Sequence, residues 1–198
     1  MSEKPQVEFF FSFRSPYSYL AGERAFALAD KWDIALIYQG VRPMVTRGVP
    51  LPNSKKFYIL RDAEREARRL GIPFGNMHDP LGEGALRCLR VGELAKDLGR
   101  ERAFVTRTAR AIWSEAADVT RDEVLRPLCE GAGLAWDECR EALKSEALLQ
   151  RCEQNVERLR AYGQWGVPTF VFRGEPFWGQ DRIEDLERVL EDAGVARK

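Results

Sequence analysis

The stretch FFFSFRSPYSYLAG, residues 9–22, joins a buried strand to a helix. The apolar, β-rich residues of its first half predict the strand. Ser15 is a favourable N-cap, and Pro16 is tolerated at the first helical position because its missing N–H would be unpaired there anyway. Residues 17–32 then carry an apolar stripe at helical spacing, and residues 34–38 predict a second strand. This order favours a parallel strand pair with a right-handed crossover.

The C-terminal segment GVPTFVFRGEPFWG, residues 166–179, predicts two more short strands around a tight turn, and residues 180–194 have the apolar spacing of a helix. Between the two ends, residues 54–163 predict several helices and no strand. Neither end can bury a sheet alone. Joined, they give an α/β fold, a thioredoxin-like four-stranded mixed sheet with a large all-helical insertion. We expect a thioredoxin-like domain from residues 1–53 plus 164–198 and a helical insertion domain from residues 54–163.

The composition limits the classes of function. The 198 residues contain 31 Lys and Arg against 31 Asp and Glu, so no positive excess favours nucleic acid as a partner. No apolar run approaches the ~20 residues of a membrane span, so no membrane partner is expected. The polar start MSEKPQ lacks the apolar core of a signal peptide, which favours a cytoplasmic location. One histidine and four scattered cysteines, expected to be buried free thiols, predict no metal site.

Three motifs occur in order along the chain: SPYSYLA at residues 15–21, GVPTF at residues 166–170 and FWGQDR at residues 177–182. Together with the split sheet, they resemble the DsbA-like branch of the thioredoxin superfamily. Within that branch the chain is similar to kappa-class glutathione transferases and 2-hydroxychromene-2-carboxylate isomerases. The resemblance covers the whole chain and is strongest at its two ends. It implies glutathione as cofactor, a small aromatic substrate and a homodimer.

Ser15 is the candidate catalytic residue. Ser15 and Ser18 flank Pro16-Tyr17 at the spacing of a C-x-x-C redox motif, but neither can form a disulfide. The helix N-terminus favours an anion, and in redox relatives that anion is a protein thiolate. Here the thiol must come from outside, and glutathione is the abundant cytoplasmic thiol. We expect Ser15 to donate a hydrogen bond to the glutathione sulfur and lower its pKa, as the family's matching serine implies. A plain N-cap is the alternative.

The Val167-Pro168 bond is the second expected element of the site. The resemblance implies that this bond is cis and that the Val167 main chain pairs with the cysteinyl part of glutathione. In the alternative, the proline merely starts a strand. At the last helix, the N-terminus attracts the γ-glutamyl carboxylate, and Asp181 can pair with the ammonium group. The resemblance adds Pro16, Tyr17, Asn53, Lys56 (or Lys55), Trp178, Gly179 and Gln180 as further glutathione contacts, with helix caps and solvated lysines as the structural alternatives.

An apolar substrate pocket is expected beside this site, lined by Arg14, Tyr17, Phe74, Met77 and Trp113. For the aromatic residues and Met77, a core position is the alternative, and it is the more usual role of such side chains. At Ser12 and Arg14 the chain departs from the isomerases, which usually have an acid and an aliphatic residue there. Arg14 would hold a substrate carboxylate or extend its charge into water. The single histidine, His78, is an acid–base candidate at neutral pH or a surface residue.

These observations lead to one functional hypothesis and two alternatives. The leading hypothesis is a glutathione-dependent cis–trans isomerase that acts on an aromatic keto-acid resembling 2-hydroxychromene-2-carboxylate by reversible thiolate addition. The first alternative is a kappa-type glutathione transferase or peroxidase with the same site. The second is a non-catalytic DsbA-like protein that binds peptides along the cis-proline edge. The serines at both motif positions argue against a dithiol oxidoreductase.

Overall fold

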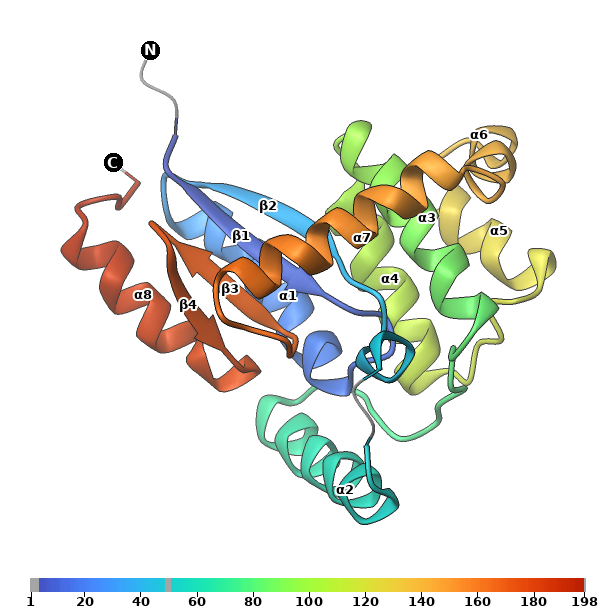
Figure 1. Cartoon of the computed structure of the whole chain (residues 1–198), viewed down its shortest axis with the longest axis horizontal. Helices are drawn as coiled ribbons and strands as arrows, with labels where there is room; N and C mark the ends of the chain where they lie inside the picture. Colours follow the sequence, from blue (N-terminus) through green and yellow to red (C-terminus); the bar gives the residue numbers. More distant parts are fainter. Residues whose placement is uncertain (1–3, 49–50, 198) are drawn as a thin grey trace.

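A four-stranded mixed sheet forms the centre of the molecule (Figure 1). A computed structural model describes residues 4–48 and 51–197. The strands are β1 (Gln6–Phe11), β2 (Ala35–Gly40), β3 (Thr169–Phe172) and β4 (Glu175–Trp178), in the spatial order β2-β1-β3-β4. The central strand β1 is parallel to β2 and antiparallel to β3, and β4 is antiparallel to β3. The sheet predicted from the two ends of the sequence is therefore confirmed.

Helix α1 (Pro16–Lys31) connects β1 to β2, and α8 (Ile183–Asp192) follows β4 after the short 3₁₀ turn η2 (Gln180–Arg182). The insertion between β2 and β3 contains η1 (Met44–Arg47), α2 (Asn53–Leu70), α3 (Glu83–Asp97), α4 (Glu101–Ser114), α5 (Asp122–Glu130), α6 (Trp136–Ala142) and α7 (Glu146–Ala161). The large helical insertion is thus confirmed, whereas its status as a separate domain stays a prediction. Among the described residues, no helix has the length and apolar composition needed to cross a bilayer.

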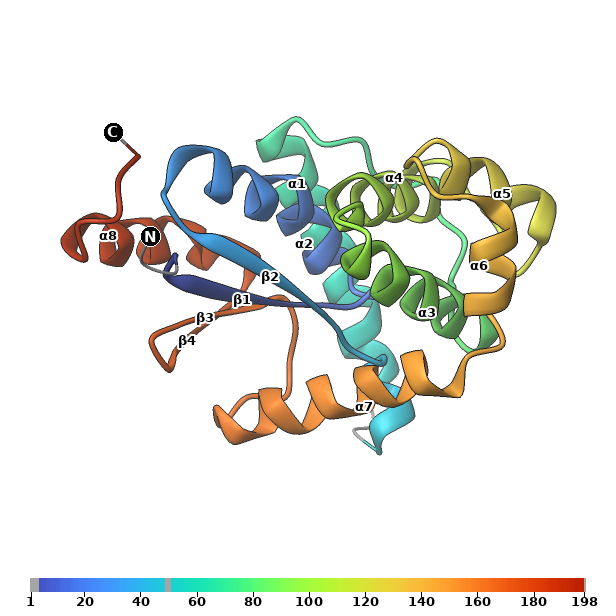
Figure 2. The ribbon, with the colours of Figure 1, turned by 90° about the horizontal axis from the view of Figure 1, so that it is seen from above.

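Helices cover both faces of the sheet (Figure 2). Because neighbouring strand residues point to opposite faces, the phenylalanines of β1 divide between two apolar cores. Phe9 and Phe11 pack with side chains of α1 and α8, and the Phe9 ring stacks on Phe170 with centroids 4.9 Å apart. Phe10 points the other way and packs with Val156 of α7. The uninterrupted apolar run in the sequence is therefore a strand buried on both faces.

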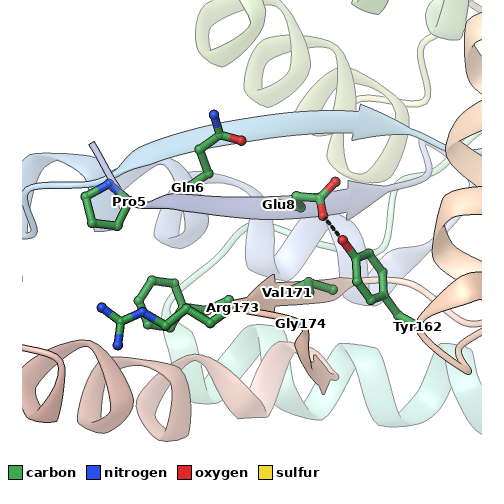
Figure 3. A pocket seen from close by; sticks show the side chains of 8 residues that line it. Pro5, Gln6, Glu8, Tyr162, Val171, Arg173 and Gly174 are labelled. Atoms are coloured by element: carbon green, nitrogen blue, oxygen red, sulfur yellow. Dashed lines mark hydrogen bonds between the residues drawn. The ribbon is translucent and has the colours of Figure 1, made fainter. Parts of the chain in front are cut away.

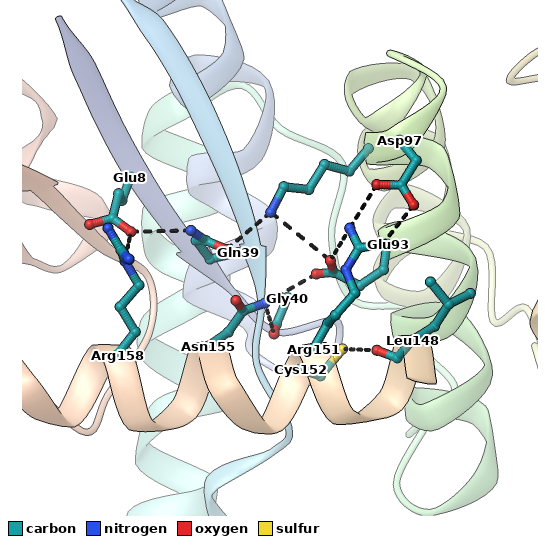
Figure 4. Close-up of polar contacts among 11 residues, drawn as sticks. Glu8, Gln39, Gly40, Glu93, Asp97, Leu148, Arg151, Cys152, Asn155 and Arg158 are labelled. Carbon is teal, nitrogen blue, oxygen red and sulfur yellow. Dashed lines mark hydrogen bonds and ion pairs between the residues drawn. The ribbon is translucent and has the colours of Figure 1, made fainter. Parts of the chain in front are cut away.

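Polar contacts fasten α7 to the sheet and to α3 (Figure 4). The buried Glu8 carboxylate accepts hydrogen bonds from Arg158 and from the Tyr162 hydroxyl. Asn155 donates to Glu93 Oε1 at 3.1 Å, and the Glu93 side chain is only 1% exposed. Buried charges are tolerated where such partners satisfy them. These contacts fix the orientation of α7, the helix that leads the chain back to β3.

Tyr38 of β2 is held in a space that two glycines provide. Its ring is buried, and its hydroxyl has no hydrogen-bond partner within residues 4–48 and 51–197. A Cβ atom on Gly92 of α3 would lie 2.9 Å from the Tyr38 hydroxyl oxygen, and one on Gly40 would lie 2.8 Å from it. Real Cβ contacts are longer than this, so α3 can approach β2 closely only because position 92 lacks a side chain.

We predict that Gly92→Ala lowers the free energy of unfolding by about 1–3 kcal/mol, because the added methyl group overpacks Tyr38. Gly22→Ala in α1 is the matched control. Its Cβ would lie 3.8 Å from the Phe11 ring, an ordinary contact, so helix propensity should make it neutral or stabilising by up to about 1 kcal/mol. Urea denaturation measures both. Equal losses of stability in the two variants would contradict the prediction. So would an unchanged loss of stability from Gly92→Ala in a Tyr38→Phe background, which lacks the hydroxyl that the new methyl group would contact.

Candidate active site

Ser15 occupies the N-cap position of α1, as the sequence predicts. Its Oγ accepts a hydrogen bond from the Ser18 N–H at 3.1 Å and donates one to the Val167 carbonyl at 3.2 Å. Pro16 follows at the start of the helix, where no backbone donor is required. The helix dipole gives this end of α1 a partial positive charge. The hydroxyl therefore lies where an anion would be stabilised.

The Val167-Pro168 peptide bond is cis, which confirms the expectation from the sequence. Val167 lies just before β3, with its carbonyl facing Ser15. In the part of the chain that the structure describes, the Val167 N–H donates to no protein acceptor. The Pro168 carbonyl, by contrast, accepts a hydrogen bond from the Gly179 N–H at 3.0 Å. The main chain of Val167 thus remains available to pair with an extended ligand.

A largely apolar pocket of about 450 Å³ opens beside Ser15 and Val167. Its wall is built from the start of α1, the loop after β2, helix α2, the loop before α3, the end of α4 and the segment that precedes β3. The structure brings most of the predicted site residues to this wall, namely Arg14, Ser15, Pro16, Tyr17, Lys56, Met77, Trp113, Val167 and Trp178. Lys55 and Ser12 line it as well.

Phe74 and Asn53 are expected ligand contacts that lie outside the pocket wall. The Phe74 ring stacks on Trp113, with centroids 5.8 Å apart, and on Tyr19, with centroids 6.4 Å apart. Phe74 therefore supports Trp113 from behind. Asn53 opens α2 and accepts a hydrogen bond from Lys56 at 3.2 Å. Contact of either residue with a ligand stays a prediction.

The remaining predicted contacts, Pro168, Gly179, Gln180 and Asp181, also lie outside the pocket wall. Gln180 is only 4% exposed. Its amide oxygen accepts from Arg24 at 2.9 Å, and its amide nitrogen donates to Glu66 at 2.9 Å. Asp181 pairs with Arg182 at 3.1 Å. The Gln180 side chain thus ties η2 to α1 and α2, and its main-chain carbonyl also accepts from Arg24 at 3.0 Å. Within the described residues, this leaves its main-chain N–H for the predicted ligand contact.

Two polar contacts set the charge beside Ser15. Arg14 donates two hydrogen bonds to Asp79, at 2.7 and 2.8 Å. Burial raises the pKa of Asp79, but the hydrogen bond and charge of Arg14 outweigh it and hold that pKa below its usual range. Tyr17 donates to Asp62 at 2.7 Å, and burial together with this carboxylate raises the pKa of the phenol. Tyr17 therefore stays protonated at neutral pH.

A second cavity, of about 380 Å³, lies beside β1 and β3, with Tyr162 at one end and Arg173 at the other (Figure 3). Two of its titratable groups, Glu8 and Tyr162, serve the fold, because Glu8 accepts from Tyr162 and from Arg158. His78 lines neither cavity; its Nε2 lies 3.6 Å from Asp118 at the surface. Among the described residues, no three His, Cys, Asp or Glu side chains lie together in a group that could hold a metal ion. The Ser15 pocket is therefore the candidate site.

Residues 6–191 match the protein-family model of the DSBA-like thioredoxin domain. The chain belongs to this family. Its sequence is 27% identical to the 2-hydroxychromene-2-carboxylate isomerase of Pseudomonas putida over 195 residues, covering 93% of each chain. It is 25% identical to the rat (Rattus norvegicus) glutathione S-transferase kappa 1 over 214 residues, covering 96% of this chain and 93% of the relative. A solved 2-hydroxychromene-2-carboxylate isomerase superposes with a TM-score of 0.77 at 25% identity, covering 95% of both chains.

Two features of this DSBA-like chain decide the chemistry that the pocket can support. The four cysteines are free and buried, as the sequence predicts, and none lines the pocket. Burial raises the pKa of Cys88 and Cys152, which keeps those thiols protonated. The N-terminus of α1 carries the hydroxyl of Ser15 and no thiol. The chain therefore contributes no sulfur nucleophile at this site.

Several pocket residues were not predicted from the sequence: Pro43, Met44, Arg47, Leu51, Tyr58, Ile59, Leu60, Asp79, Trp165 and Gly166. Most belong to the loop after β2 and to α2. A signal existed in α2, because residues 55, 56, 59 and 60 lie on one side of a helix. Trp165 directly precedes the GVPTF motif and packs edge-on against Trp178, with centroids 5.1 Å apart. The loop residues carry no periodic pattern that could have identified them.

We predict that Asp79→Asn lowers stability by at most about 1 kcal/mol at neutral pH, because the ion pair with Arg14 is partly exposed. The Asp79 pKa is lower in the folded than in the unfolded chain, so this contribution is present above about pH 4 and disappears as the pH falls through the folded-state pKa. Urea titrations of wild type and variant at several pH values measure the difference. A difference that persists at the lowest pH, or that survives in an Arg14→Met background, would contradict this assignment.

Proposed function

We propose that the chain is a glutathione-dependent cis–trans isomerase that acts on an aromatic keto-acid of the 2-hydroxychromene-2-carboxylate type. The observation that carries the proposal is the position of the Ser15 hydroxyl, at the positive end of α1, 3.2 Å from the Val167 carbonyl and open to an apolar pocket without cysteine. The similarity to 2-hydroxychromene-2-carboxylate isomerases over nearly the full chain supports the same conclusion.

The residues at the site fit glutathione. The unpaired N–H of Val167 and its carbonyl can pair with an extended tripeptide in the manner of an added strand. The exposed Asp181 carboxylate, near the end of β4, is suited to the γ-glutamyl ammonium group. Bound glutathione would supply a thiolate for reversible addition to a conjugated double bond. A serine in place of a cysteine prevents capture of that sulfur as a protein disulfide.

The chain's own residues would act by placement and electrostatics. The Ser15 Oγ already accepts from the Ser18 N–H, so its proton is free to turn from the Val167 carbonyl toward an anionic sulfur. The positive end of α1 adds to this stabilisation. Preorganised donors of this kind stabilise charge without reorganisation during the reaction. Apolar side chains such as Met77 and Trp113 would hold an aromatic ring and exclude water.

A kappa-type transferase remains the second candidate, because a kappa-class relative matches over nearly the whole chain. The two activities use the same site and differ in the fate of glutathione. An isomerase returns it unchanged, whereas a transferase consumes it in a lasting conjugate. Product analysis with 2-hydroxychromene-2-carboxylate and with a generic electrophile such as a chlorodinitrobenzene separates them. We also propose a homodimer in the cytoplasm, which sedimentation analysis and cell fractionation would test.

We predict that Ser15→Ala lowers kcat by about 10²–10³-fold, because the donor to the developing sulfur charge is lost. The pKa of the bound glutathione thiol should rise, which the ultraviolet absorbance of the thiolate reports directly. The substitution also removes a helix cap, at a cost of about 1 kcal/mol in stability. Ser145→Ala is the matched control, because Ser145 caps α7 through the same bond, from the Leu148 N–H at 3.2 Å, and does not line the pocket.

The control variant should lose similar stability and keep full activity. If Ser15→Ala and Ser145→Ala lose the same amount of activity, Ser15 is only a cap and its catalytic role is wrong. If wild-type protein shows no glutathione binding by calorimetry, the proposed cofactor is wrong. Peptide binding that persists without glutathione binding would then favour a non-catalytic binding protein.

A further inference from the structure

The wall of the Ser15 pocket carries more positively charged than negatively charged side chains. Four cations line the pocket, Arg14, Arg47, Lys55 and Lys56, against one carboxylate, that of Asp79. Such an excess beside apolar walls raises the local concentration of anions and favours an anionic ligand. The four cations differ in how the protein already satisfies them, and this difference identifies the group that awaits a ligand.

Three of the four cations need no ligand. Arg14 is neutralised by the two-point contact with Asp79. Lys56 donates to Asn53 at 3.2 Å, and Lys55 and Lys56 are both exposed on the first turn of α2, where water solvates an ammonium group. A surface lysine of this kind costs little to leave unpaired.

Arg47, at the end of η1, is different. Its Nη2 donates to the Trp165 carbonyl at 2.9 Å. Its Nε is buried and has no acceptor within the described ranges, and no ion pair is found for its guanidinium there. The carboxylate of Glu153, whose field reaches Arg47, is paired with Arg42. Burial, with the nearby positive charges of Arg160 and Arg42, lowers the pKa of Arg47.

A half-buried cation with an unsatisfied donor is costly for the protein alone. Buried donors in folded proteins nearly always have a partner, and a charged group pays a larger desolvation penalty than a neutral one. Because the enclosed Nε is closed to a ligand oxygen as it is to water, a carboxylate would pair with the Nη groups of Arg47, in the two-point geometry that guanidinium groups favour, and its charge would offset the cost of burying the cation. The bond to the Trp165 carbonyl holds the guanidinium in place beside the pocket before any ligand arrives.

We propose that Arg47 binds a carboxylate of the ligand in this pocket. The identity of that ligand rests on the proposed function, which offers two carboxylates of the same chemistry, that of the aromatic acid and that of the glycine of glutathione. Trp165 lies two residues before Val167, so the bond from Arg47 also links the loop after β2 to the segment that presents the Val167 main chain. Arg47 is therefore a binding residue placed close to the candidate catalytic group.

The test is calorimetric and needs no turnover. Glutathione, glutathione amidated at its glycine, 2-hydroxycinnamate and 2-hydroxycinnamamide are titrated into wild type, Arg47→Met and Arg47→Lys. We expect Arg47→Met to weaken binding of one carboxylate ligand roughly 10- to 100-fold, the range for a lost charge-assisted hydrogen bond. The matching amide should bind wild type and Arg47→Met equally. Arg47→Lys should fall between them, since it keeps the charge and loses the two-point geometry.

The matched control is Arg65→Met, which removes the same charge from an exposed position on α2 outside the pocket and should change no affinity. Wild type must itself prefer the carboxylate over the amide, a measurement that does not depend on any variant folding. A loss confined to 2-hydroxycinnamate assigns Arg47 to the aromatic acid, and a loss confined to glutathione assigns it to the glycine carboxylate.

The inference is overturned if wild type does not distinguish either carboxylate from its amide, or if Arg47→Met binds both carboxylates as tightly as wild type. A different result would refute the proposed function alone. If glutathione fails to bind wild type while 2-hydroxycinnamate binds through Arg47, the carboxylate site stands and the glutathione-dependent activity does not.

Discussion

The pairing of β1 with two neighbours of opposite direction is the constraint on which the site depends. Because β1 is antiparallel to β3, with Phe10 opposite Thr169, the end of β1 lies beside the start of β3. Because β2 is parallel to β1, with Phe11 opposite Gly40, the end of β2 reaches the same edge. Three chain segments, which carry Ser15, Arg47 and Val167, therefore meet at one edge of the sheet although Ser15 and Val167 are 152 residues apart. The register of β1 with β3 is therefore what brings Ser15 into contact with Val167.

The helical insertion completes what the sheet edge begins. Alone, the ends of β1 and β3 would present a hydroxyl and a free main-chain segment to open water. Helix α2, with Lys56, and the end of α4, with Trp113, turn this edge into a bounded pocket. Helix α7 returns the chain along the opposite face, held by buried polar contacts such as those of Glu8 and Glu93 (Figure 4). The insertion therefore encloses the site on one side of the sheet and stabilises the sheet from the other.

The sequence predicts this fold well because its signals are local. Apolar runs and helix caps place α1 and β2 within two residues of their observed ends, whereas the predicted last helix starts three residues before α8 because Gln180–Arg182 form the 3₁₀ turn η2. The three motifs lead to Ser15 and the cis bond at Pro168. The pocket wall is predicted only in part. Glutamine is usually exposed, yet Gln180 is buried, and its side chain bonds to Arg24 and Glu66 on two other helices. Arg47 lies in an aperiodic loop, and its missing partner is a property of the assembled structure. Neither can be read from one segment alone.

The division of the pocket between sheet edge and insertion has an evolutionary consequence. Ser15 and Val167 are fixed by strand register, so change there is costly for the fold. The facing wall belongs to loops and to α2, where Tyr58 is largely exposed and substitution costs little stability. A lineage can therefore change the pocket wall through substitutions in residues 43–60 while Ser15 and Val167 stay unchanged. In such a family the shape of the pocket should diverge faster than the sheet edge that carries Ser15 and Val167.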